Sequence, residues 1–494
     1  MEPESQNELF AIRRAKLDAL RALGVDPFGG RFDPTGSVAE IRARFAEGNA
    51  ERAAGRLTAH RDMGRSHFLD LNDGTDRIQL FVSTKELPPA QVELFKLLDL
   101  ADFIGVEAEC FVTKTGEPSL RVKNITLLSK ALRPLPSAWY GLADVEHRYR
   151  QRYVDLLVNP ASREVFLQRI RIVREIREFL HARGFLEVET PMMQAVAGGA
   201  AAQPFTTHHN ALGLELYLRI APELYLKRLL VGGFTKIFEL NRNFRNEGIS
   251  RRHNPEFTML EAYWAFADFE LMADLVEELI CHLAQTIHGS LLIEHKDADG
   301  KVIRTIDLTR PWRRASYRDL VREAAGADWY ELSPEARRER AGFIPDSREP
   351  GAGIAPGIAD FEVTQHMFEK LVEEHTFNPL FVTHCPAELV PLARQNARDP
   401  GTVDVYELII NGQEISPGYS ELNDPVVQRE RLEHQAGEEK QKIDEDFLTA
   451  LEHGMPPAGG IGIGIDRLVM MLTGAESIRD VILFPQLKPA QRQG

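Results

Sequence analysis

Charged and aromatic residues gather in the segment 244–261, which reads FRNEGISRRHNPEFTMLE and holds three arginines, three glutamates, one histidine and two phenylalanines. Arginine forks suit phosphate oxygens, a phenylalanine face suits a planar base, and a glutamate accepts a hydrogen bond from an exocyclic amine. The segment therefore predicts a nucleotide-binding site. A solvated hairpin loop with ordinary ion pairs and a core phenylalanine fits the same residues.

The surrounding sequence predicts a hairpin that positions this segment. TKIFELNRNF before it and NPEFTMLEAYWAF after it are typical of strands, and RNEGISRRHN between them is typical of a loop. The loop would hold Arg245, Glu247 and His253 at its rim. Because the period of a strand is two residues, four side chains of the second strand share one face: Phe257, Met259, Glu261 and Tyr263.

A second group of acids lies in DVYELIINGQEISPGYSELNDP. Asn411-Gly412 predicts a two-residue turn, which pairs position 409 with 414 and position 407 with 416. Glu407 and Glu414 then share one face, and a Mg²⁺ ion that carries triphosphate oxygens would relieve their repulsion. A solvent-facing acidic hairpin is the alternative. Glu421 has the opposite parity to Glu414, so only a bulge or kink at SPG would turn it into the same cleft.

A third stretch, GGIGIGIDRLVMML, alternates glycine with isoleucine before a predicted helix that begins near Asp466. Arg467 then lies in the first helical turn, where the helix dipole disfavours a cation, so we expect a nearby anion. The run matches neither GxGxxG nor GxxxxGK[ST], the two common phosphate-binding motifs. A structural glycine strand packed closely against its neighbour is the alternative.

Length and composition restrict the class of protein. The 494 residues exceed the size of a single hydrophobic core, and no apolar run is long enough for a membrane helix. The net charge of -15 argues against indiscriminate binding of nucleic acid. Cys110, Cys281 and Cys385 have no zinc-ligand spacing and indicate reduced thiols, and the first residues lack the apolar stretch of a secretory signal. We expect a cytoplasmic, multidomain protein.

The pattern along the chain predicts four parts and an α+β fold. A strong helix is expected from Ser162, as its N-cap, to a left-handed stop at Gly184. Residues 330–360, rich in Arg, Glu, Gly and Pro, are typical of an insertion or mobile segment. The predicted parts are an amphipathic helical arm (1–54), a small all-β barrel (55–135), a linker (136–160) and an α+β domain built on an antiparallel sheet (161–494).

Three stretches together resemble the class II aminoacyl-tRNA synthetases, and among them the members that handle lysine. FLEVETPMM resembles motif 1, FELNRNFRNEGISRRHNPEFTMLEAY resembles motif 2, and GIGIGIDRLVMML resembles motif 3. The resemblance covers nearly the whole chain. It implies an antiparallel catalytic sheet flanked by helices, an N-terminal OB-fold that binds the anticodon, and a homodimer formed around motif 1.

The resemblance also implies a reaction. L-lysine is activated by ATP as lysyl-adenylate, with release of pyrophosphate, and is then transferred to the 3′ end of tRNA(Lys). Neither displacement needs a protein nucleophile, so catalysis rests on positioning and charge stabilisation. The resemblance assigns Arg245, Arg467 and His253 to catalysis at the phosphates, Glu247 and Phe257 to adenine, and Glu407 and Glu414 to Mg²⁺.

The implied lysine site and anticodon site use separate sets of residues. The substrate lysine would be bound by Gly199, Glu223, Arg245, Glu261, Tyr263, Tyr419 and Glu421. The anticodon would be bound by Arg61, Phe68, Gln79 and Phe81. Stacking of aromatic rings on single-stranded bases fits the two phenylalanines, but alternation alone leaves open whether they face outward or into the barrel core.

The sequence departs from the family pattern at four positions. Pro417 stands where an asparagine that helps to hold the substrate is usual, and a proline has neither a side-chain nor a backbone N–H to donate. Gln203, His384 and Val390 replace an arginine, an acid and a small polar residue. The alternatives are a relative that acts on a protein or on another basic amino acid, and a non-enzymatic regulator that binds tRNA or nucleotide. Relatives that act on a protein lack the barrel, and a regulator would be expected to lose Arg245 or Arg467.

Overall fold

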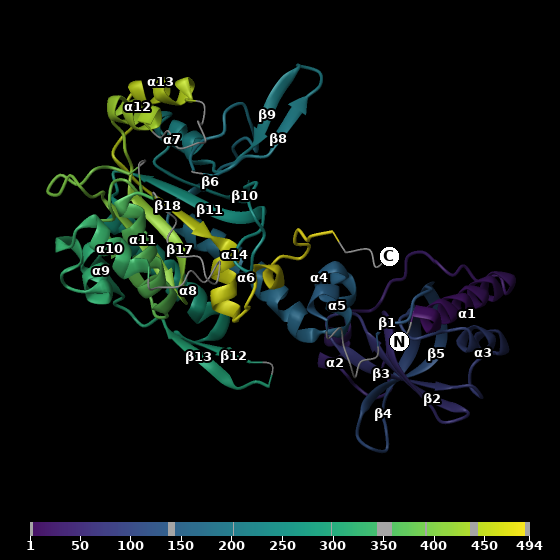
Figure 1. Cartoon of the computed structure of the whole chain (residues 1–494). Helices are drawn as coiled ribbons and strands as arrows, with labels where there is room; N and C mark the ends of the chain where they lie inside the picture. The colour runs from purple at the N-terminus through teal and green to yellow at the C-terminus, as the bar shows by residue number, and fades with distance from the viewer. Residues whose placement is uncertain are drawn as a thin grey trace. The chain divides into compact units, whose positions relative to one another are not determined.

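The computed structural model describes residues 3–136, 144–200, 202–297, 299–342, 358–390, 393–434 and 443–489. The chain divides into two compact units, residues 1–143 and 144–494 (Figure 1). The finer division predicted from the sequence stays a prediction, and residues 343–357 of the expected insertion at 330–360 lie outside the described residues. No helix in the described part of the chain is both long and apolar enough to cross a membrane.

The first unit is built on a closed barrel in the order β1-β2-β3-β5-β4, in which only β3 and β5 pair in parallel. Alternating burial along the strands places residues such as Leu69, Leu80 and Val106 inside the barrel. The elements are α1 (Pro3–Ala22), α2 (Val38–Ala43), β1 (Ala50–Asp62), β2 (Ser66–Asn72), β3 (Arg77–Ser83), α3 (Pro89–Lys96), β4 (Phe103–Val112) and β5 (Pro118–Ser129).

The second unit is organised by an eight-stranded sheet in the order β14-β15-β16-β17-β18-β11-β10-β6. The pairs β14–β15 and β10–β6 at its two edges are parallel, and every pairing between them is antiparallel. The predicted antiparallel sheet is therefore confirmed for its centre. The strands are β6 (Leu186–Glu187), β10 (Lys236–Phe244), β11 (Glu256–Ala265), β14 (Arg313–Ser316), β15 (Leu380–Thr383), β16 (Val405–Ile410), β17 (Gln413–Ser420) and β18 (Ala458–Gly464).

Two smaller sheets and the helices complete this unit. The small sheets comprise β7 (Met193–Gln194), β8 (Thr206–His209) and β9 (Leu214–Leu218), and β12 (Leu292–Lys296) and β13 (Val302–Asp307). The helices are α4 (Val145–Arg150), α5 (Arg152–Val158), α6 (Pro160–Ala182), α7 (Glu223–Val231), α8 (Phe269–His288), α9 (Tyr317–Ala325), η1 (Trp329–Glu331), α10 (Pro334–Gly342), α11 (Asp360–Leu371), η2 (Glu373–His375), α12 (Pro425–His434), α13 (Glu445–Glu452), α14 (Ile465–Thr473) and α15 (Ile478–Val481).

The helix α6 begins earlier than the sequence predicted. Asn159 occupies the N-cap position and Pro160 the first helical position, so the prediction of Ser162 as the cap is wrong. A proline suits the first turn because its missing N–H has no helical partner there and its φ is already helical. The predicted stop is confirmed, since Gly184 adopts a left-handed φ of 79°.

The two faces of the central sheet have different partners. Helices α8 and α14 pack against the sheet and α6 packs against both helices. Leu260, Ala262 and Ile461 point into the apolar core that these helices bury. Because side chains alternate along a strand, the intervening residues such as Glu261 and Tyr263 point to the opposite face, where α7 covers part of β11 and the remainder is open to a cavity.

Candidate active site on the open face of the sheet

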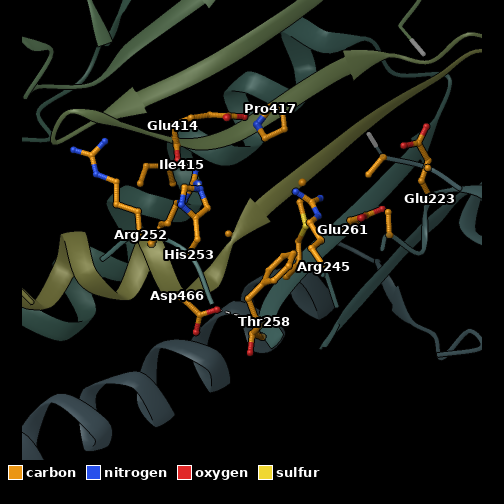
Figure 2. A pocket seen from close by; sticks show the side chains of 18 of the residues that line it. Glu223, Arg245, Arg252, His253, Thr258, Glu261, Glu414, Ile415, Pro417 and Asp466 are labelled. Carbon is orange, nitrogen blue, oxygen red and sulfur yellow. Dashed lines mark hydrogen bonds between the residues drawn. The ribbon is translucent and has the colours of Figure 1, made fainter. Parts of the chain in front are cut away.

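A cavity of about 420 Å³ lies on this open face of the sheet (Figure 2). In the view of Figure 2, Glu223 and Glu261 stand toward one end and Arg252 and His253 toward the other. Of the residues predicted for catalysis, nucleotide, metal or lysine binding, those that line the cavity are Gly199, Glu223, Arg245, Glu247, His253, Phe257, Glu261, Tyr263, Glu414, Tyr419 and Arg467. Glu407 and Glu421 are not part of the lining.

The predicted hairpin around the motif 2 segment is confirmed. Strand β10 pairs with β11 in register, for example Asn243 with Phe257 and Glu239 with Glu261. All four residues that were expected to share one face of β11 line the cavity.

The glycines of β18 leave room for the side chains of β11. Gly460, Gly462 and Gly464 pair with Tyr263, Glu261 and Met259, respectively. A Cβ on Gly462 would lie 2.6 Å from the Met259 Cε, so a side chain there would close part of the cavity. The alternating isoleucines enter the core on the other face. The glycine run thus packs closely against β11, and the side chains that it lacks leave space for the pocket.

Arg245 is poised to bind an anion. Its backbone N–H donates to the Pro255 carbonyl (2.8 Å), and its guanidinium carbon lies 5.1 Å from the centre of the Phe257 ring. Its Nε is buried without a hydrogen-bond partner among the described residues. Burial lowers the pKa of this guanidinium, against the opposing effect of Glu247 and other acids. A buried donor of this kind is costly unless a ligand accepts its hydrogen bond.

Arg467 is fixed at the start of α14 by two contacts. Its Nη1 donates to the Glu414 carbonyl (2.9 Å) and its Nη2 lies 3.2 Å from Nε2 of His253. Because a guanidinium can only donate, Nε2 of His253 must accept, which leaves the ring hydrogen on Nδ1 facing the Ser250 hydroxyl at 2.9 Å. The arginine and the histidine therefore hold each other at the cavity wall.

A buried ion pair joins α14 to β11 and α6. Asp466 accepts from the Thr258 N–H (2.8 Å) and from Nη1 of Arg169 (2.6 Å), and Nη2 of Arg169 donates to the Thr258 hydroxyl (3.0 Å). Asp466 is paired with Arg169, so the anion that was expected to offset Arg467 stays a prediction. The contacts fix the helix end from which Arg467 projects.

The acidic hairpin forms as predicted at its turn but not along its whole register. Asn411 and Gly412 both have positive φ, 58° and 72°, as a two-residue turn of the expected kind requires. The predicted pairing of 407 with 416 is wrong, because a bulge leaves Ile415 without an opposite residue and pairs Glu407 with Pro417. The extra residue brings Pro417, Tyr419 and the chain leading to Glu421 onto the same face as Glu414.

Carboxylates crowd together beside this hairpin. Burial raises the pKa of Glu407 to about 8, with the Glu414 charge as the second cause. Burial followed by Glu414 also raises the pKa of Glu373, in η2, to about 7. Within the described ranges no three His, Cys, Asp or Glu side chains are arranged to hold a metal ion. Two carboxylates suit Mg²⁺ when substrate phosphates supply further oxygens, so Glu407 and Glu414 fit such an ion.

The opposite end of the cavity is lined by acids and a phenol. Glu261 is 5% exposed and its carboxylate accepts from the Tyr263 hydroxyl at 3.2 Å. Burial, and then the charge of Glu223, raise the pKa of Glu261 to about 8. Gly199 approaches this wall with a φ of 85°, and a Cβ there would lie 3.1 Å from the Glu223 Cβ. Acids at one end and arginines toward the other suit a ligand with amines and phosphates.

The family models match both units of the chain. Residues 144–488 match the model described as tRNA synthetases class II (D, K and N), and residues 52–128 match the model described as OB-fold nucleic acid binding domain. The chain belongs to the class II tRNA synthetases. The resemblance of the three motif-like stretches to this family is confirmed.

Relatives of high identity indicate the branch of this synthetase family. The chain is 48% identical to a lysine–tRNA ligase of Carboxydothermus hydrogenoformans, over 99% of this chain and 100% of the relative. It is 49% identical to one of Syntrophomonas wolfei, over 98% and 97%, and 45% identical to one of Staphylococcus haemolyticus, over 98% and 99%. Within the class II synthetases, the chain therefore lies among the lysine–tRNA ligases.

The OB-fold of this synthetase carries the four predicted anticodon residues on one outward face. Phe68 pairs with both Arg61 and Phe81 in neighbouring strands, and the two phenylalanine rings are 5.3 Å apart. Both rings are half-buried, whereas Leu69 and Leu80 beside them fill the core. The alternative that Phe68 and Phe81 are core residues is therefore wrong.

Sequence reasoning missed two charged residues of this synthetase site. Lys227, fully buried in α7, lies between Glu223 and Glu421. The spacing of Lys227 from Glu223 is that of an ordinary exposed i,i+4 pair, so only the apolar residues around Lys227 indicate that it is buried. Glu373 lies outside the hairpin sequence, and no local sequence pattern predicts that it comes close to the acidic hairpin.

Proposed function

We propose that this chain activates L-lysine with ATP as lysyl-adenylate and transfers the lysyl group to the 3′ end of tRNA(Lys). The observation that carries the proposal is one cavity with buried carboxylates at one end and Arg245, Arg467 and His253 farther along it. Its volume suits a nucleotide joined to a small amino acid. The high identity to lysine–tRNA ligases supports the same substrates.

The proposed first step is an attack of the lysine carboxylate on the α-phosphorus of ATP. Arg245 would bridge the two reacting groups through its Nε, which has no partner among the described residues, and Arg467, beside His253, would bind the γ-phosphate. Phe257 would stack on adenine while Glu247 accepts from its exocyclic amine. Preorganised cations of this kind stabilise the charge that develops during phosphoryl chemistry.

Magnesium is the proposed metal ion, bound by Glu407 and Glu414. When bound, it would neutralise phosphate charge and orient the pyrophosphate leaving group. The raised pKa of Glu407, caused by burial and by Glu414, supports the need for a cation beside these carboxylates. The register of the hairpin puts both carboxylates on one face of its strands.

The lysine substrate is proposed to lie at the acidic end. Glu223 would accept from its α-ammonium, near the close approach of Gly199, and Glu261, Tyr263 and Glu421 would surround the distal ammonium. Tyr419 would complete the wall. A buried cation must be paired, so an amino acid without the distal charge would leave these carboxylates unsatisfied and be rejected.

Two further proposals concern assembly and location. Exposed apolar side chains lie on α6 and near the C-terminal end, where Ile170 is 63% and Phe484 is 72% exposed. Both line a second groove of the catalytic unit. Such a surface supports a homodimer around motif 1, which sedimentation equilibrium would detect as twice the 55.7 kDa chain mass. We also propose a cytoplasmic location.

The direct test of the proposed function is charging of tRNA. Incubation with ATP, Mg²⁺, labelled lysine and unfractionated tRNA should form a base-labile lysyl-tRNA, with one AMP released for each lysine bound. Label on protein in place of tRNA would favour the protein-modifying relative. Nucleotide or tRNA binding without any adenylate formation would favour a regulator.

The raised pKa of Glu261 predicts that lysine binds more tightly as pH rises. Below about pH 8 this carboxyl is largely protonated in the free protein, because burial and Glu223 outweigh Tyr263, Arg219 and Arg245. The lysine ammonium binds the ionised form, so the KM for lysine should fall by up to about tenfold per pH unit between pH 6 and 8. Pyrophosphate exchange at several pH values measures it.

The matched control is Glu261→Gln, which should raise the KM for lysine and flatten its dependence on pH.

The ionisation of Glu261 should also affect the stability of the fold. The folded protein retains a proton that the unfolded chain loses above pH 4.5, so the free energy of unfolding falls as pH rises toward 8. Lysine should therefore raise the melting temperature more at pH 8 than at pH 6. A KM independent of pH in the unmodified protein would contradict this assignment.

Pro417 is expected to weaken lysine binding. Its ring lines the cavity, with Cγ 3.8 Å from the position that a Cβ on Gly462 would take, and it offers no N–H. Pro417→Asn would supply an amide whose hydrogen bond contributes about 0.5–3 kcal/mol, depending on what is otherwise left unpaired. The KM for lysine in exchange should then fall by up to about a hundredfold.

The KM for ATP serves as the internal control for Pro417→Asn and should stay within about threefold. If Pro417→Asn leaves the KM for lysine unchanged, the absence of an amide at this position does not weaken lysine binding. If the unmodified protein prefers another basic amino acid, Pro417 instead marks a retuned pocket.

A further inference from the structure

Lys227 is a buried ammonium inside the acidic end of the cavity wall. It lies on α7, and its side chain is fully buried. Its Nζ lies 2.7 Å from Oε1 of Glu223 and 2.5 Å from Oε2 of Glu421. It therefore bridges two carboxylates that come from different parts of the chain, one at the start of α7 and one just after β17.

The other oxygen of Glu421 occupies the space that a side chain at Gly460 would take. A Cβ on Gly460 would overlap this Oε1 and lie 2.7 Å from Cε1 of Tyr263. Any side chain at position 460 would therefore displace the carboxylate or the ring. The backbone N–H of Glu421 donates to the Ala458 carbonyl (2.8 Å), which fixes the start of this side chain. Lys227 thus binds one oxygen of the Glu421 carboxylate, and the missing side chain at Gly460 leaves room for the other.

The charges at this end of the cavity indicate what Lys227 does. Three buried carboxylates, Glu223, Glu261 and Glu421, lie at this end, and Lys227 pairs with two of them, Glu223 and Glu421. Arg219, another buried cation nearby, is already paired with Glu239 at 2.6 Å. If all three acids are ionised, two negative charges remain uncompensated, and free lysine carries two ammonium groups. Its carboxylate is left for Arg245.

We propose that Lys227 is a positioning residue for lysine recognition. It keeps the carboxylates of Glu421 and Glu223 oriented, and it leaves a net negative charge that the two ammonium groups of the substrate neutralise. The proposal rests on the proposed lysine activity. Without Lys227 the three carboxylates would carry one more uncompensated charge, and Glu421 would turn away or bind a proton. Lys227 itself stays protonated, because Glu223 and Glu421 outweigh the effect of burial and raise its pKa.

The test compares Lys227→Met with the unmodified full-length protein in lysine-dependent ATP–pyrophosphate exchange. Loss of one partner from a buried ion pair is strongly unfavourable, so the KM for lysine should rise at least about thirtyfold. The KM for ATP should stay within about threefold, because the phosphate end is unchanged. The KM for lysine of Lys227→Met, divided by that of the unmodified protein, should fall as pH rises from 6.5 to 8.5. At high pH the Glu421 carboxyl ionises even without the ammonium of Lys227.

Two further variants separate positioning from simple support of the fold. Lys227→Arg keeps the charge and should restore much of the lysine affinity. Gly460→Ala disturbs Glu421 from the other side and should raise the KM for lysine without raising that for ATP.

The matched control is Lys130→Met in the barrel unit. Lys130 is also a fully buried lysine between two carboxylates, 2.7 Å from Asp99 and 2.8 Å from Asp102. Its replacement should destabilise the barrel unit and leave the lysine KM in exchange unchanged.

The outcomes decide the proposal. It is overturned if Lys227→Met folds and its lysine KM stays within about threefold, or if the KM values for lysine and ATP rise together in a ratio independent of pH. If Lys227→Met does not fold, Gly460→Ala decides in the same way. Failure of the unmodified protein to activate lysine would overturn the proposed function instead, and the same assay shows it before any variant is compared.

Discussion

Alanine at Arg245 or at Arg467 is expected to lower kcat/KM for ATP–pyrophosphate exchange by at least about a hundredfold, the usual consequence of losing one preorganised charge contact. Arg245 has a buried Nε without a partner among the described residues, and Arg467 is held by Glu414 and His253. Both guanidiniums are therefore aimed before the phosphates arrive. Steady-state exchange with saturating lysine measures the loss.

Folding should change little in these variants, which the melting temperature checks. Arg251→Ala is the matched control, because Arg251 lies in the same loop, is exposed and does not line the cavity. It should keep activity within about threefold. Exchange within tenfold of the unmodified protein in both Arg245→Ala and Arg467→Ala would contradict the phosphate assignment.

Removal of residues 1–143 is expected to separate the two steps of the reaction. The catalytic unit contains the whole cavity, so lysine-dependent exchange should stay within about tenfold. Charging of tRNA should fall by at least about a hundredfold, because the stacking platform for single-stranded bases is lost. Equal loss of exchange and charging would indicate that the barrel unit only supports the catalytic unit.

Point variants test the same idea in the full chain. Phe68→Ala combined with Phe81→Ala should weaken charging by at least about tenfold, since each stacked base contributes about 1–3 kcal/mol, and leave exchange unchanged. Phe103→Ala is the matched control, because Phe103 is another partly exposed phenylalanine of the barrel that packs against Arg56. Its charging rate should stay close to that of the unmodified protein.

Local rules predicted those parts of the fold that depend on neighbouring residues. Asn411-Gly412 forms its turn because both residues tolerate positive φ, and the face of β11 follows from strand period alone. The N-cap predicted at Ser162 is wrong because Pro160, which suits the first helical turn, starts the helix two residues earlier, with Asn159 as its cap.

Features that depend on distant contacts were harder to predict. The bulge at Ile415 shifts the register of β17 by one residue, and no residue type in SPG requires it at that position. The burial of Lys227 depends on Glu421, nearly two hundred positions later, so the sequence around α7 indicates only an ordinary surface pair. The outward face of the barrel likewise became clear only from its closed strand order.

The most direct test of the central claim is ATP–pyrophosphate exchange by the full-length protein with each of the twenty standard amino acids in turn. Three buried carboxylates predict that lysine supports the fastest exchange: Glu223 and Glu261 in the cavity lining, and Glu421, which Lys227 joins to Glu223. An amino acid without a distal cation would leave them unpaired. Lysine should exceed every other amino acid by at least about a hundredfold in kcat/KM. Faster exchange with any other amino acid, or exchange with none, would contradict the proposed function.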